Sequence, residues 1–573
     1  MRVHPISNWH EVSKLPKHVN PAHASEIFSL LITEEHLETI ARHTNEYAAL
    51  HRQHPLQKHA RPWIDTTPRE LLAYIATYIW MGLHPEHDVA EYWNTDEDDG
   101  PIHKPVQKHI SLVRWQQLDR FFHVSKPNLE GKETPFDKVW PLSEELRTAV
   151  KKYWNPTTHL AVDECIERFQ GRAKETVNIP SKPTPEGFKI WCLANAGYIL
   201  DWLFHSRGTG PVDLDTYWTK ACGFSPTQAV VLDLLLQEGI NNDCRHVVWL
   251  DNLFTSARLL ATLKGEGVGA AGTVRTTLSR AEWLASVDTA PDAAPEQSQS
   301  QQTQTQQSQS QKPLKESNRG LDPSLAELKL EHNNQIPWGK LYGRLSADGE
   351  VLQFAWKDQQ VVLFMTTVTG VSKEGQTNTV KRVRKRPSAT ASNARTSRAA
   401  FGSEVLKELE IPEFIHLYNH FMGGVDNADK LRVYYNTQRV HLKSWKPLWH
   451  WLLDVAIVNS YKLSHHAQHY DDPDLPCERF EKQREFRKAL VKRLFQRSER
   501  LTTPRYDRSV TMADLVWPAE EGSDHIPYHK GKRGYCKACE AADLCTGLFS
   551  GAHLTKLWDS LTPISHTLPE RLK

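Results

Sequence analysis

The sequence predicts an α/β fold in which a sheet is preceded and followed by mainly helical segments. From residue 157 onward it reads as three strands, a helix, a strand, a second helix and a further strand, the order expected of an α/β sheet with a crossover connection. Residues 1–156 and residues 412–470 instead show helical patterns. Because domains typically hold ~100–200 residues, a chain of 573 residues predicts roughly three structural units.

Helices are expected throughout the first 156 residues. Thr67, Pro68 and Glu70 supply an N-cap, a proline at the first helical position and a capping-box acid ahead of the apolar run LLAYIATYIWMG. One helix is predicted for SEIFSLLITEEHLETIARHTNEY and another around Trp115 and Phe121, because their apolar residues recur at helical spacing.

The sheet is expected in residues 157–275. HLAVDECI, FKIWCLA and YILDWLFHS predict three strands, the last two joined by the hairpin signal Asn195-Ala196-Gly197. TQAVVLDLLLQ predicts a helix, HVVWLDN a short buried strand, the stretch from Phe254 to about Lys264 a second helix, and VGAAGTVR a further strand. Residues 412–470 would complete the core with aromatic-rich helices.

An insertion is predicted at residues 276–411. Its Gln/Ser/Thr tract, residues 293–317, cannot bury enough apolar surface to become ordered. KLYGRL-SADGE-VLQFAW-KDQQ-VVLFMTT predicts a three-stranded meander with Asp348-Gly349 at its first turn. The basic segment, residues 381–398, contains no acid and has the composition of a nuclear localisation signal, a phosphate-binding patch or a solvated loop.

Composition excludes several classes of protein. With 70 Lys+Arg against 69 Asp+Glu the formal net charge is +1, so the chain is no uniformly basic nucleic-acid coat. No apolar run approaches the ~18 residues that span a bilayer, and the first residues lack the apolar core of a signal peptide, so we expect no membrane association. Eight Cys are too sparse for a disulfide framework, which favours a reducing intracellular compartment.

Two acids stand at the predicted carboxyl ends of strands, where functional groups of α/β sheets gather: Asp163 and Asp251. Paired carboxylates bind hard divalent cations, and a two-metal site activates the attacking oxygen and stabilises the leaving oxygen in phosphodiester cleavage. Asp426 and Asp429 are candidates for the third acid, because their spacing puts both on one helical face. Structural alternatives are that Asp251 caps the helix near Phe254 and that Asp426 simply favours a helix N-terminus.

The amino-acid sequence resembles that of the piggyBac-type transposases from about residue 28 to residue 463. The resemblance is carried by eight separated blocks in the expected order: FSLLITEEHLETIARHTNEYA, WIDTTPRELLAYIATYIWMGLHP, LAVDECIERFQGR, NIPSKPTPEGFKIWCLANAGY, VVWLDNLFTSARLLATLKGEGVGAAGTVR, WKDQQVVLFMTT, YNHFMGGVDNADKLRVYY and WHWLLDVAIVNSYKL. A single VDE tripeptide would be a weak signal, whereas ordered blocks over most of the chain are a specific one.

This resemblance implies a ribonuclease H-like catalytic core, split by the insertion and preceded by a helical dimerisation and DNA-binding region at residues 1–156. It assigns Asp163, Asp251 and Asp426 as a catalytic triad that binds Mg²⁺ or Mn²⁺, as two ions, with Asp429 as a fourth acid. The implied reaction cuts a transposon end with water, after which the freed 3′-hydroxyl attacks DNA, with hairpin intermediates and TTAA as target. The implied partners are double-stranded DNA, at transposon ends and target, and a second copy of the chain.

Further residues acquire a role through the same resemblance. Basic side chains near the acids would contact DNA phosphates, or else belong to ordinary solvated surface: Arg172, Lys182, Lys189 and Arg275. Trp445 matches an aromatic position near the family's active site, where it could stack on an unpaired base or simply pack in the core. A DNA enzyme that carries the basic segment is expected in the nucleus.

The last segment, residues 471–573, reads as a charged linker and a reduced cysteine tail. Cys536, Cys539 and Cys545 have metal-like spacing, and His525, His529 or His553 could complete one tetrahedral Zn²⁺ site. Family members commonly end in a domain that binds two zinc ions and reads terminal repeats, for which three cysteines are too few. Two functions are therefore left open: an active DNA transposase, and a domesticated host DNA-binding protein of the same fold without transposition activity.

Overall fold

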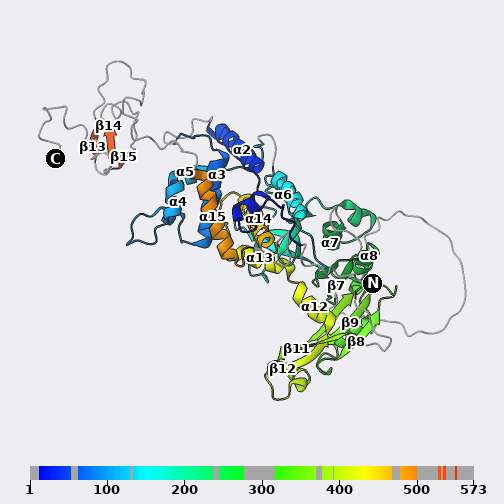
Figure 1. Ribbon diagram of the computed structural model, residues 1–573. Helices are drawn as coiled ribbons and strands as arrows, with labels where there is room; N and C mark the ends of the chain where they lie inside the picture. The colour runs from blue at the N-terminus through cyan, green and yellow to red at the C-terminus, as the bar shows by residue number, and fades with distance from the viewer. Residues whose placement is uncertain are drawn as a thin grey trace, which may run out of the picture. The chain divides into compact units, whose positions relative to one another are not determined.

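The computed structural model describes residues 12–52, 62–128, 133–236, 244–276, 317–368, 377–391, 393–467 and 478–499, together with the backbone of three short strands near the C-terminus. The chain divides into two units, Met1–Leu501 and Thr502–Lys573 (Figure 1). In the second unit the strands β13 (Pro527–Lys530), β14 (Arg533–Cys536) and β15 (Phe549–Ser550) pair into one small sheet. Most of the Gln/Ser/Thr tract, and Cys539, Cys545 and His553, lie outside the described residues.

The first part of the chain is helical, as predicted. Its helices are α1 (Ala24–Ser29), α2 (Glu34–Arg52), α3 (Pro68–Leu83), α4 (Lys104–His109), α5 (Leu112–Phe121) and α6 (Trp140–Lys152), with a 3₁₀ helix η2 at Val89–Trp93. The predicted start of α3 is confirmed, because the Thr67 side chain accepts a hydrogen bond from the backbone N–H of Glu70. Among the described residues no helix is both long and apolar enough to cross a membrane.

The single helix predicted over α1 and α2 is wrong, because the chain breaks between Ser29 and Glu34. Thr33 and His36 explain the break. The backbone N–H of His36 donates to Thr33 Oγ1 at 3.3 Å, and the backbone N–H of Thr33 donates to His36 Nδ1 at 3.0 Å. This reciprocal pair caps a new helix in the manner of a capping box, although the apolar periodicity runs across it.

The largest sheet has ten strands, of which nine follow the order β5-β4-β3-β1-β6-β7-β10-β9-β8, while β2 pairs only with β3. Strands β1, β6 and β7 are parallel to one another, and the other pairs are antiparallel. The strands are β1 (His159–Arg168), β2 (Val177–Asn178), β3 (Glu186–Asn195), β4 (Tyr198–Ser206), β5 (Gly210–Pro211), β6 (Val247–Leu250), β7 (Gly269–Thr273), β8 (Leu341–Leu345), β9 (Leu352–Lys357) and β10 (Val361–Thr366).

The turns that the sequence predicts within this sheet are present. Ala196 and Gly197, at φ 51° and 84°, make the left-handed turn between β3 and β4. The meander β8–β9–β10 turns first at Asp348-Gly349, with Gly349 at φ 72°. Because β10 also pairs with β7, through Phe364 and Thr273, the meander continues the sheet that contains β1 and β6.

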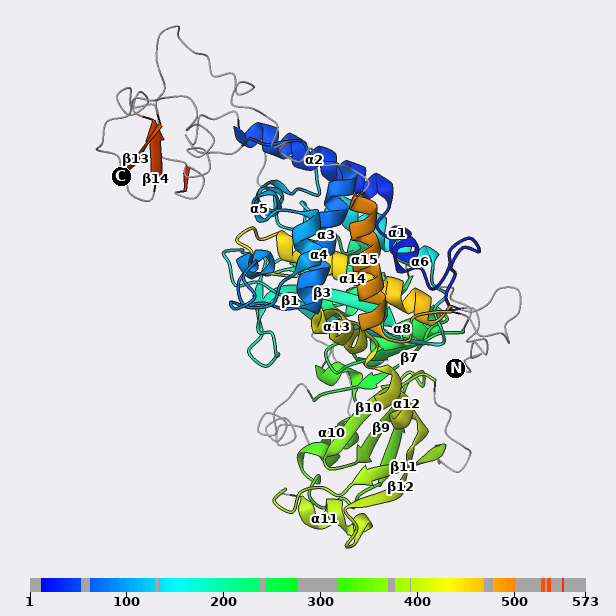
Figure 2. The same ribbon diagram turned by 60° about the vertical axis from the view of Figure 1, so that its left-hand side comes forward.

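Helices cover the sheet and fill the connections. They are η3 (Tyr217–Ala221), α7 (Pro226–Leu236), α8 (Ala257–Gly265), η4 (Ser317–Gly320), α10 (Pro323–Leu330), α12 (Glu413–Phe421), α13 (Gly424–Tyr434), α14 (Lys446–His465) and α15 (Gln483–Glu499). Helix α13 lies across β1 and β3 (Figure 2), and α14 is buried along nearly its whole length.

Helix α15 lies in the segment that the sequence suggested was a charged linker. Its apolar residues recur every four positions, and Phe486, Leu490 and Leu494 are fully buried where α15 packs against α3. Arg487, also fully buried, donates to Asp454 of α14 at 3.3 Å. Composition alone did not reveal this apolar stripe, because α15 also carries many charged residues.

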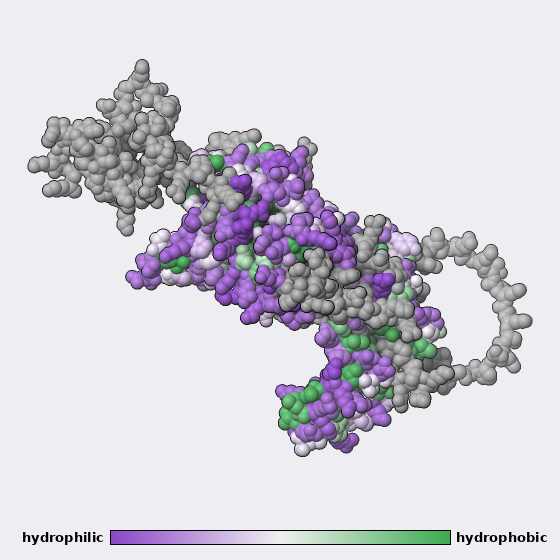
Figure 3. Space-filling view, viewed as in Figure 1, coloured by the Kyte–Doolittle hydropathy of each residue, from purple (hydrophilic) through white to green (hydrophobic). Residues whose placement is uncertain are grey.

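The basic segment begins as a strand, β11 (Thr379–Lys385), which pairs with β12 (Leu406–Pro412). Two of its basic residues have acidic neighbours, since Lys381 faces Glu410 across the pair and Arg384 forms an ion pair with Asp358. Figure 3 shows a hydrophobic area over the end of this ribbon, where Val405 and Leu406 are exposed.

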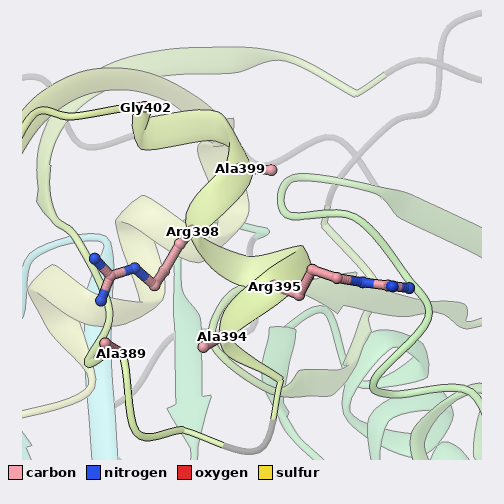
Figure 4. Close-up of a pocket in the computed structure, with 6 residues that line it drawn as sticks. All are labelled: Ala389, Ala394, Arg395, Arg398, Ala399 and Gly402. Atoms are coloured by element: carbon pink, nitrogen blue, oxygen red, sulfur yellow. The ribbon is translucent and has the colours of Figure 1, made fainter.

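Beyond β11 the basic segment forms α11 (Ala394–Arg398) and the 3₁₀ helix η5 (Ala399–Phe401). Arg395 and Arg398 border a hollow of about 360 Å³ walled by small residues, and their side chains point in opposite directions (Figure 4). The basic segment is thus a folded ribbon and helix rather than the solvated loop that was one of its sequence interpretations.

Candidate active site

Asp163 and Asp251 occupy equivalent places on neighbouring strands. Val162 of β1 pairs with Leu250 of β6 in parallel register, so each acid is the next residue along its strand. The prediction that Asp163 ends its strand is wrong, because β1 continues to Arg168 alongside β3. Strand β6 ends at Leu250, so Asp163 has no strand partner on this side. Asp251, which follows Leu250, therefore lies next to Asp163, as expected.

Burial and like charge act together on these carboxyls. The pKa of Asp163 is raised to about 8, mainly by burial and also by the charges of Glu164 and Asp251, while Lys182 acts in the lowering direction. Burial also raises the pKa of Asp251, with Glu164 adding to the shift. Two half-buried carboxyls that resist ionisation together need a positive charge nearby, and a cation between them would supply it.

Asp251 does not cap the following helix. Ser256 caps α8, through a hydrogen bond from the backbone N–H of Leu259 at 3.2 Å. Asp251 Oδ1 instead accepts the backbone N–H of Leu253 at 2.6 Å, and its backbone carbonyl accepts the Thr255 hydroxyl at 2.7 Å. The loop after β6 is therefore folded back onto Asp251, which fixes where its carboxylate points.

A third acid, Glu164, belongs to the same electrostatic cluster and was missed by sequence reasoning. Its Oε1 accepts from Lys182 Nζ at 3.0 Å, while Oε2 is buried without a hydrogen-bond partner in the described part of the chain. Lys189 Nζ lies 3.7 Å from the centre of the Trp191 ring, on the neighbouring strand β3. The sequence does show an acid next to Asp163, in the tripeptide VDE. That this acid lies near Asp251 follows only from the pairing of β1 with β6.

Helix α13 carries Asp426 and Asp429 over the face of β1 that holds Asp163. Residues 161, 163, 165 and 167 share that face by strand alternation. A Cβ on Gly424 would lie 3.1 Å from Ala161 Cβ, and Arg432 is ion-paired with buried Glu167, so the helix contacts the face at both ends. The absence of a side chain at Gly424 lets the first turn of α13, with Asp426, approach β1.

The two acids of α13 differ in their surroundings. Asp429 Oδ1 accepts from Arg432 Nη2 at 2.8 Å and from Arg432 Nε at 3.1 Å, so its charge is already paired. Asp426 is exposed in the first turn of the helix. Asn427 packs against the turn at Gly197, which places Asp429 on the opposite flank of α13, away from the β3–β4 hairpin.

The described residues hold no group of three or more His, Cys, Asp and Glu side chains close enough to bind a metal ion. The structure thus brings Asp163 and Asp251 together and leaves Asp426 and Asp429 above them on α13. The donors nevertheless suit a hard divalent cation. They are carboxylate oxygens, and the charge of Asp251 helps to raise the pKa of Asp163, so a cation would stabilise the ionised pair.

Two hydroxyl groups continue the row of acids across the sheet. Leu250 pairs with Gly272 of β7, so Thr273 follows on β7 as Asp251 follows on β6. Thr273 Oγ1 lies 3.2 Å from the hydroxyl of Tyr418, which α12 buries against this face. Burial raises the pKa of Tyr418 to about 12, and the charges of Asp251 and Asp163 contribute. Sequence reasoning missed this pair, because no local motif marks it.

The remaining predicted residues are scattered. Arg172 and Arg275 are exposed, as a contact with DNA phosphates requires, whereas Lys189 is only 8% exposed. Trp445 is buried at 3% exposure against His123 and Phe122, which matches the core-packing alternative. Cys536 is the last residue of β14 and His529 lies in the paired strand β13, whereas the other proposed zinc ligands lie outside the described residues.

Comparison with known proteins places the chain in a family. The family model described as transposase IS4 matches residues 23–461, more than half of the chain. The human PiggyBac transposable element-derived protein 2 is 22% identical over 438 residues, which cover 76% of this chain and 60% of that protein. The human PiggyBac transposable element-derived protein 3 is 22% identical over 524 residues, covering 90% of this chain and 72% of that protein.

A solved structure has the same fold. The piggyBac transposase in a synaptic complex with hairpin DNA superposes with a TM-score of 0.59 at 16% identity, covering 91% of this chain and 90% of that one. The family match, the relatives and the shared fold agree with the resemblance carried by the eight sequence blocks. The chain therefore belongs to the piggyBac-type family of transposases.

Proposed function

We propose that this protein is a divalent-metal-dependent DNA transposase whose catalytic core is ribonuclease H-like. The observation that carries the proposal is the adjacent placement of Asp163 and Asp251 one residue beyond a parallel pair of strands. The strand order β4-β3-β1-β6-β7, with β3 antiparallel to β1, is the arrangement in which such cores present two acids on neighbouring strands. Acids on a covering helix, here α13, would complete the set.

In this proposal Asp163, Asp251 and Asp426 hold Mg²⁺ or Mn²⁺, as two ions, with Asp429 nearby. The bound ions would activate the attacking oxygen and stabilise the leaving one. Asp426 stands outside the acid pair in this structure, so it would move toward β1 when metal and DNA bind. Arg432 holds Asp429 in place through two hydrogen bonds and leaves the second carboxylate oxygen for the site.

The reaction is a pair of phosphodiester exchanges. Water first attacks phosphorus at a transposon end, and the P–O bond to the departing 3′-oxygen breaks as the new one forms. The freed 3′-hydroxyl then attacks the phosphorus of a second phosphodiester, whose own 3′-oxygen leaves as the new P–O bond forms, with TTAA as the proposed target. The solved relative was captured with hairpin DNA, which supports double-stranded DNA as partner. Arg172 and Arg275 would contact its phosphates, which their exposure supports.

The assembly and the location in the cell are also proposals. We infer a homodimer built through the helical N-terminal region and action in the nucleus. The tail would bind one Zn²⁺ through Cys536, Cys539, Cys545 and His553 to support DNA recognition.

The second candidate is a domesticated DNA-binding protein of the same fold that no longer transposes. It is favoured by one observation, that no three His, Cys, Asp or Glu side chains among the described residues are placed to hold a metal ion together. A domesticated protein would bind DNA but release no nicked or joined product with any divalent ion.

The deciding experiment incubates the full chain with supercoiled plasmid DNA and Mn²⁺ or Mg²⁺. We expect nicking and strand joining, and their loss in Asp163→Asn and Asp251→Asn by about 10³-fold or more, as when charge stabilisation of a transition state is removed. Asp213→Asn is the matched control, because Asp213 is exposed at φ 58°, a conformation that Asn tolerates. Unchanged activity of Asp251→Asn would reject the proposal, and DNA binding without any product would favour the second candidate.

A further inference from the structure

Arg319 lies in the insertion, residues 276–411, and contacts the loop that carries Asp251. It lies in η4, which contacts α8, more than sixty residues along the chain from Asp251. Its Nη1 atom donates to the carbonyl oxygens of residues 252 and 253 at 2.8 Å each, and to that of Thr255 at 3.2 Å. One guanidinium thus gathers three carbonyls of the short segment between β6 and α8.

The backbone at Arg319 is strained. Its φ is 56°, in the left-handed region that disfavours residues with a Cβ, and Gly320 follows at 71°. Left-handed conformations at residues other than glycine persist only where the surrounding structure enforces them, and they gather at functional sites. Glycine would adopt this conformation without strain, so what arginine adds at this position is its guanidinium and the hydrogen bonds that it donates.

Buried Gln353 of β9 holds this conformation in place. Its side chain is 1% exposed, accepts the backbone N–H of Asp322 at 2.7 Å and donates to the carbonyl of Gly320 at 2.8 Å. Gln353 belongs to the same sheet as β6, through β10 and β7. Arg319 is therefore anchored to the sheet on one side and holds the segment that follows β6 on the other.

Leu253 is the link between Arg319 and the carboxylate. Its backbone N–H donates to Asp251 Oδ1 at 2.6 Å, and its carbonyl accepts from Arg319 Nη1 at 2.8 Å. A shift of Leu253 therefore changes the direction of the Asp251 carboxylate directly. Because these three hydrogen bonds go to backbone carbonyls, they can orient Asp251 without competing with a cation for the carboxylate oxygens.

We propose that Arg319 is a positioning residue for the metal site, which fixes the Asp251 carboxylate through Leu253. The inference rests on the proposed function, because it requires that Asp251 binds a divalent cation. It adds that a residue of the insertion, residues 276–411, helps to orient an acid of the core. Residues that orient metal ligands from outside the ligand set commonly change metal affinity by about 10–100-fold when they are removed.

The test measures Mn²⁺ binding to the full chain by titration calorimetry, without DNA, alongside the melting temperature. Arg319→Ala and Arg319→Gly both remove the guanidinium, but only Arg319→Gly also relieves the backbone strain. We expect both variants to bind Mn²⁺ about 10–100-fold more weakly, with Arg319→Gly melting at the higher temperature of the two. Arg344→Ala is the control, because exposed Arg344 contacts only the carbonyl of its neighbour Gly343.

Each outcome decides the matter. Equal Mn²⁺ binding by the unaltered protein and both variants overturns the inference alone, whereas no binding by the unaltered protein overturns the proposed function and the inference with it. Normal binding by Arg319→Gly with weak binding by Arg319→Ala would mean that the backbone conformation matters and the guanidinium does not, which also rejects the inference. Should both variants fail to fold, Arg319→Met keeps a long side chain but offers no N–H to the three carbonyls, so weak Mn²⁺ binding by this variant supports the inference and unaltered binding rejects it.

Discussion

Lys182 Nζ lies 3.0 Å from Oε1 of Glu164, the residue that follows Asp163 on β1. The lysine therefore offsets part of the negative charge that Asp163, Glu164 and Asp251 build up at this end of the sheet. It lowers the pKa of both Asp163 and Asp251, against the burial and like charge that raise them. The pair sets how readily the site becomes ionised, and so how readily it accepts a cation.

Replacement of this lysine should make metal binding more dependent on high pH. In Lys182→Met the carboxyls of Asp163 and Asp251 lose a neighbouring cation, so their pKa values rise further. Because carboxylates bind metal only when deprotonated, the pH at which Mn²⁺ begins to bind should move upward. Calorimetric titration over a pH series measures it, with exposed Lys174→Met as control. An onset at the same pH in both variants contradicts the prediction.

The stability of the metal-free protein should fall as pH rises. Burial raises the pKa of Asp163 to about 8 in the folded chain, against ~3.9 for an ordinary Asp. Between these values the folded chain binds a proton that the unfolded chain has released, so the free energy of unfolding decreases from about pH 4 to about pH 8. In Asp163→Asn this contribution is absent, and the variant should gain stability relative to the unaltered protein as pH rises.

Chemical denaturation with a chelator present, at several values between about pH 5 and pH 8, measures this difference. Asp213→Asn serves as the control, because Asp213 is exposed in a loop away from the acid pair. A difference between Asp163→Asn and the unaltered protein that stays constant over the whole range would show that Asp163 ionises normally.

Gly424 should be intolerant of a side chain. The Cβ of Gly424→Ala would meet Ala161 Cβ at 3.1 Å and the Ala194 carbonyl oxygen at 3.5 Å, which pushes α13 away from β1. We expect a loss of about 1–3 kcal/mol in the free energy of unfolding, and a larger relative loss of DNA cleavage because Asp426 moves with the helix. Gly423→Ala is the matched control, since its nearest neighbour would be 4.0 Å away. Equal effects of the two substitutions would rule out the contact as the cause.

Loss of the ion pair between Arg432 and Glu167 should lower the free energy of unfolding. Both side chains are almost fully buried, and Arg432 also donates to Asp429 at 2.8 Å. Arg432→Met leaves the Glu167 carboxyl buried without its partner, which should cost about 3–5 kcal/mol in the free energy of unfolding. Thermal and chemical denaturation measure the loss. Adding Glu167→Leu to that variant should restore much of it, and a double variant as unstable as the single one would contradict this.

The sequence by itself determined the local elements whose causes are local. Thr67 and Pro68 start α3, Ala196 and Gly197 turn β3 into β4, and the alternation of apolar residues marks the strands. It also determined the family, because ordered blocks of residues carry that information without any structure. Where two local signals competed, as at Thr33, periodicity was the weaker guide and a side-chain cap decided where α2 begins.

Tertiary structure decided everything that depends on which strands become neighbours. The pairing of Val162 with Leu250 places Asp163 beside Asp251, adds Glu164 to the cluster, and brings Thr273 with Tyr418 into the same row. It buries Trp445, pairs the basic strand with an acidic one, and carries Arg319 back to the loop after Asp251. These contacts join residues far apart in the chain, and their energy comes from burial and register across the sheet, which no local stretch of sequence encodes.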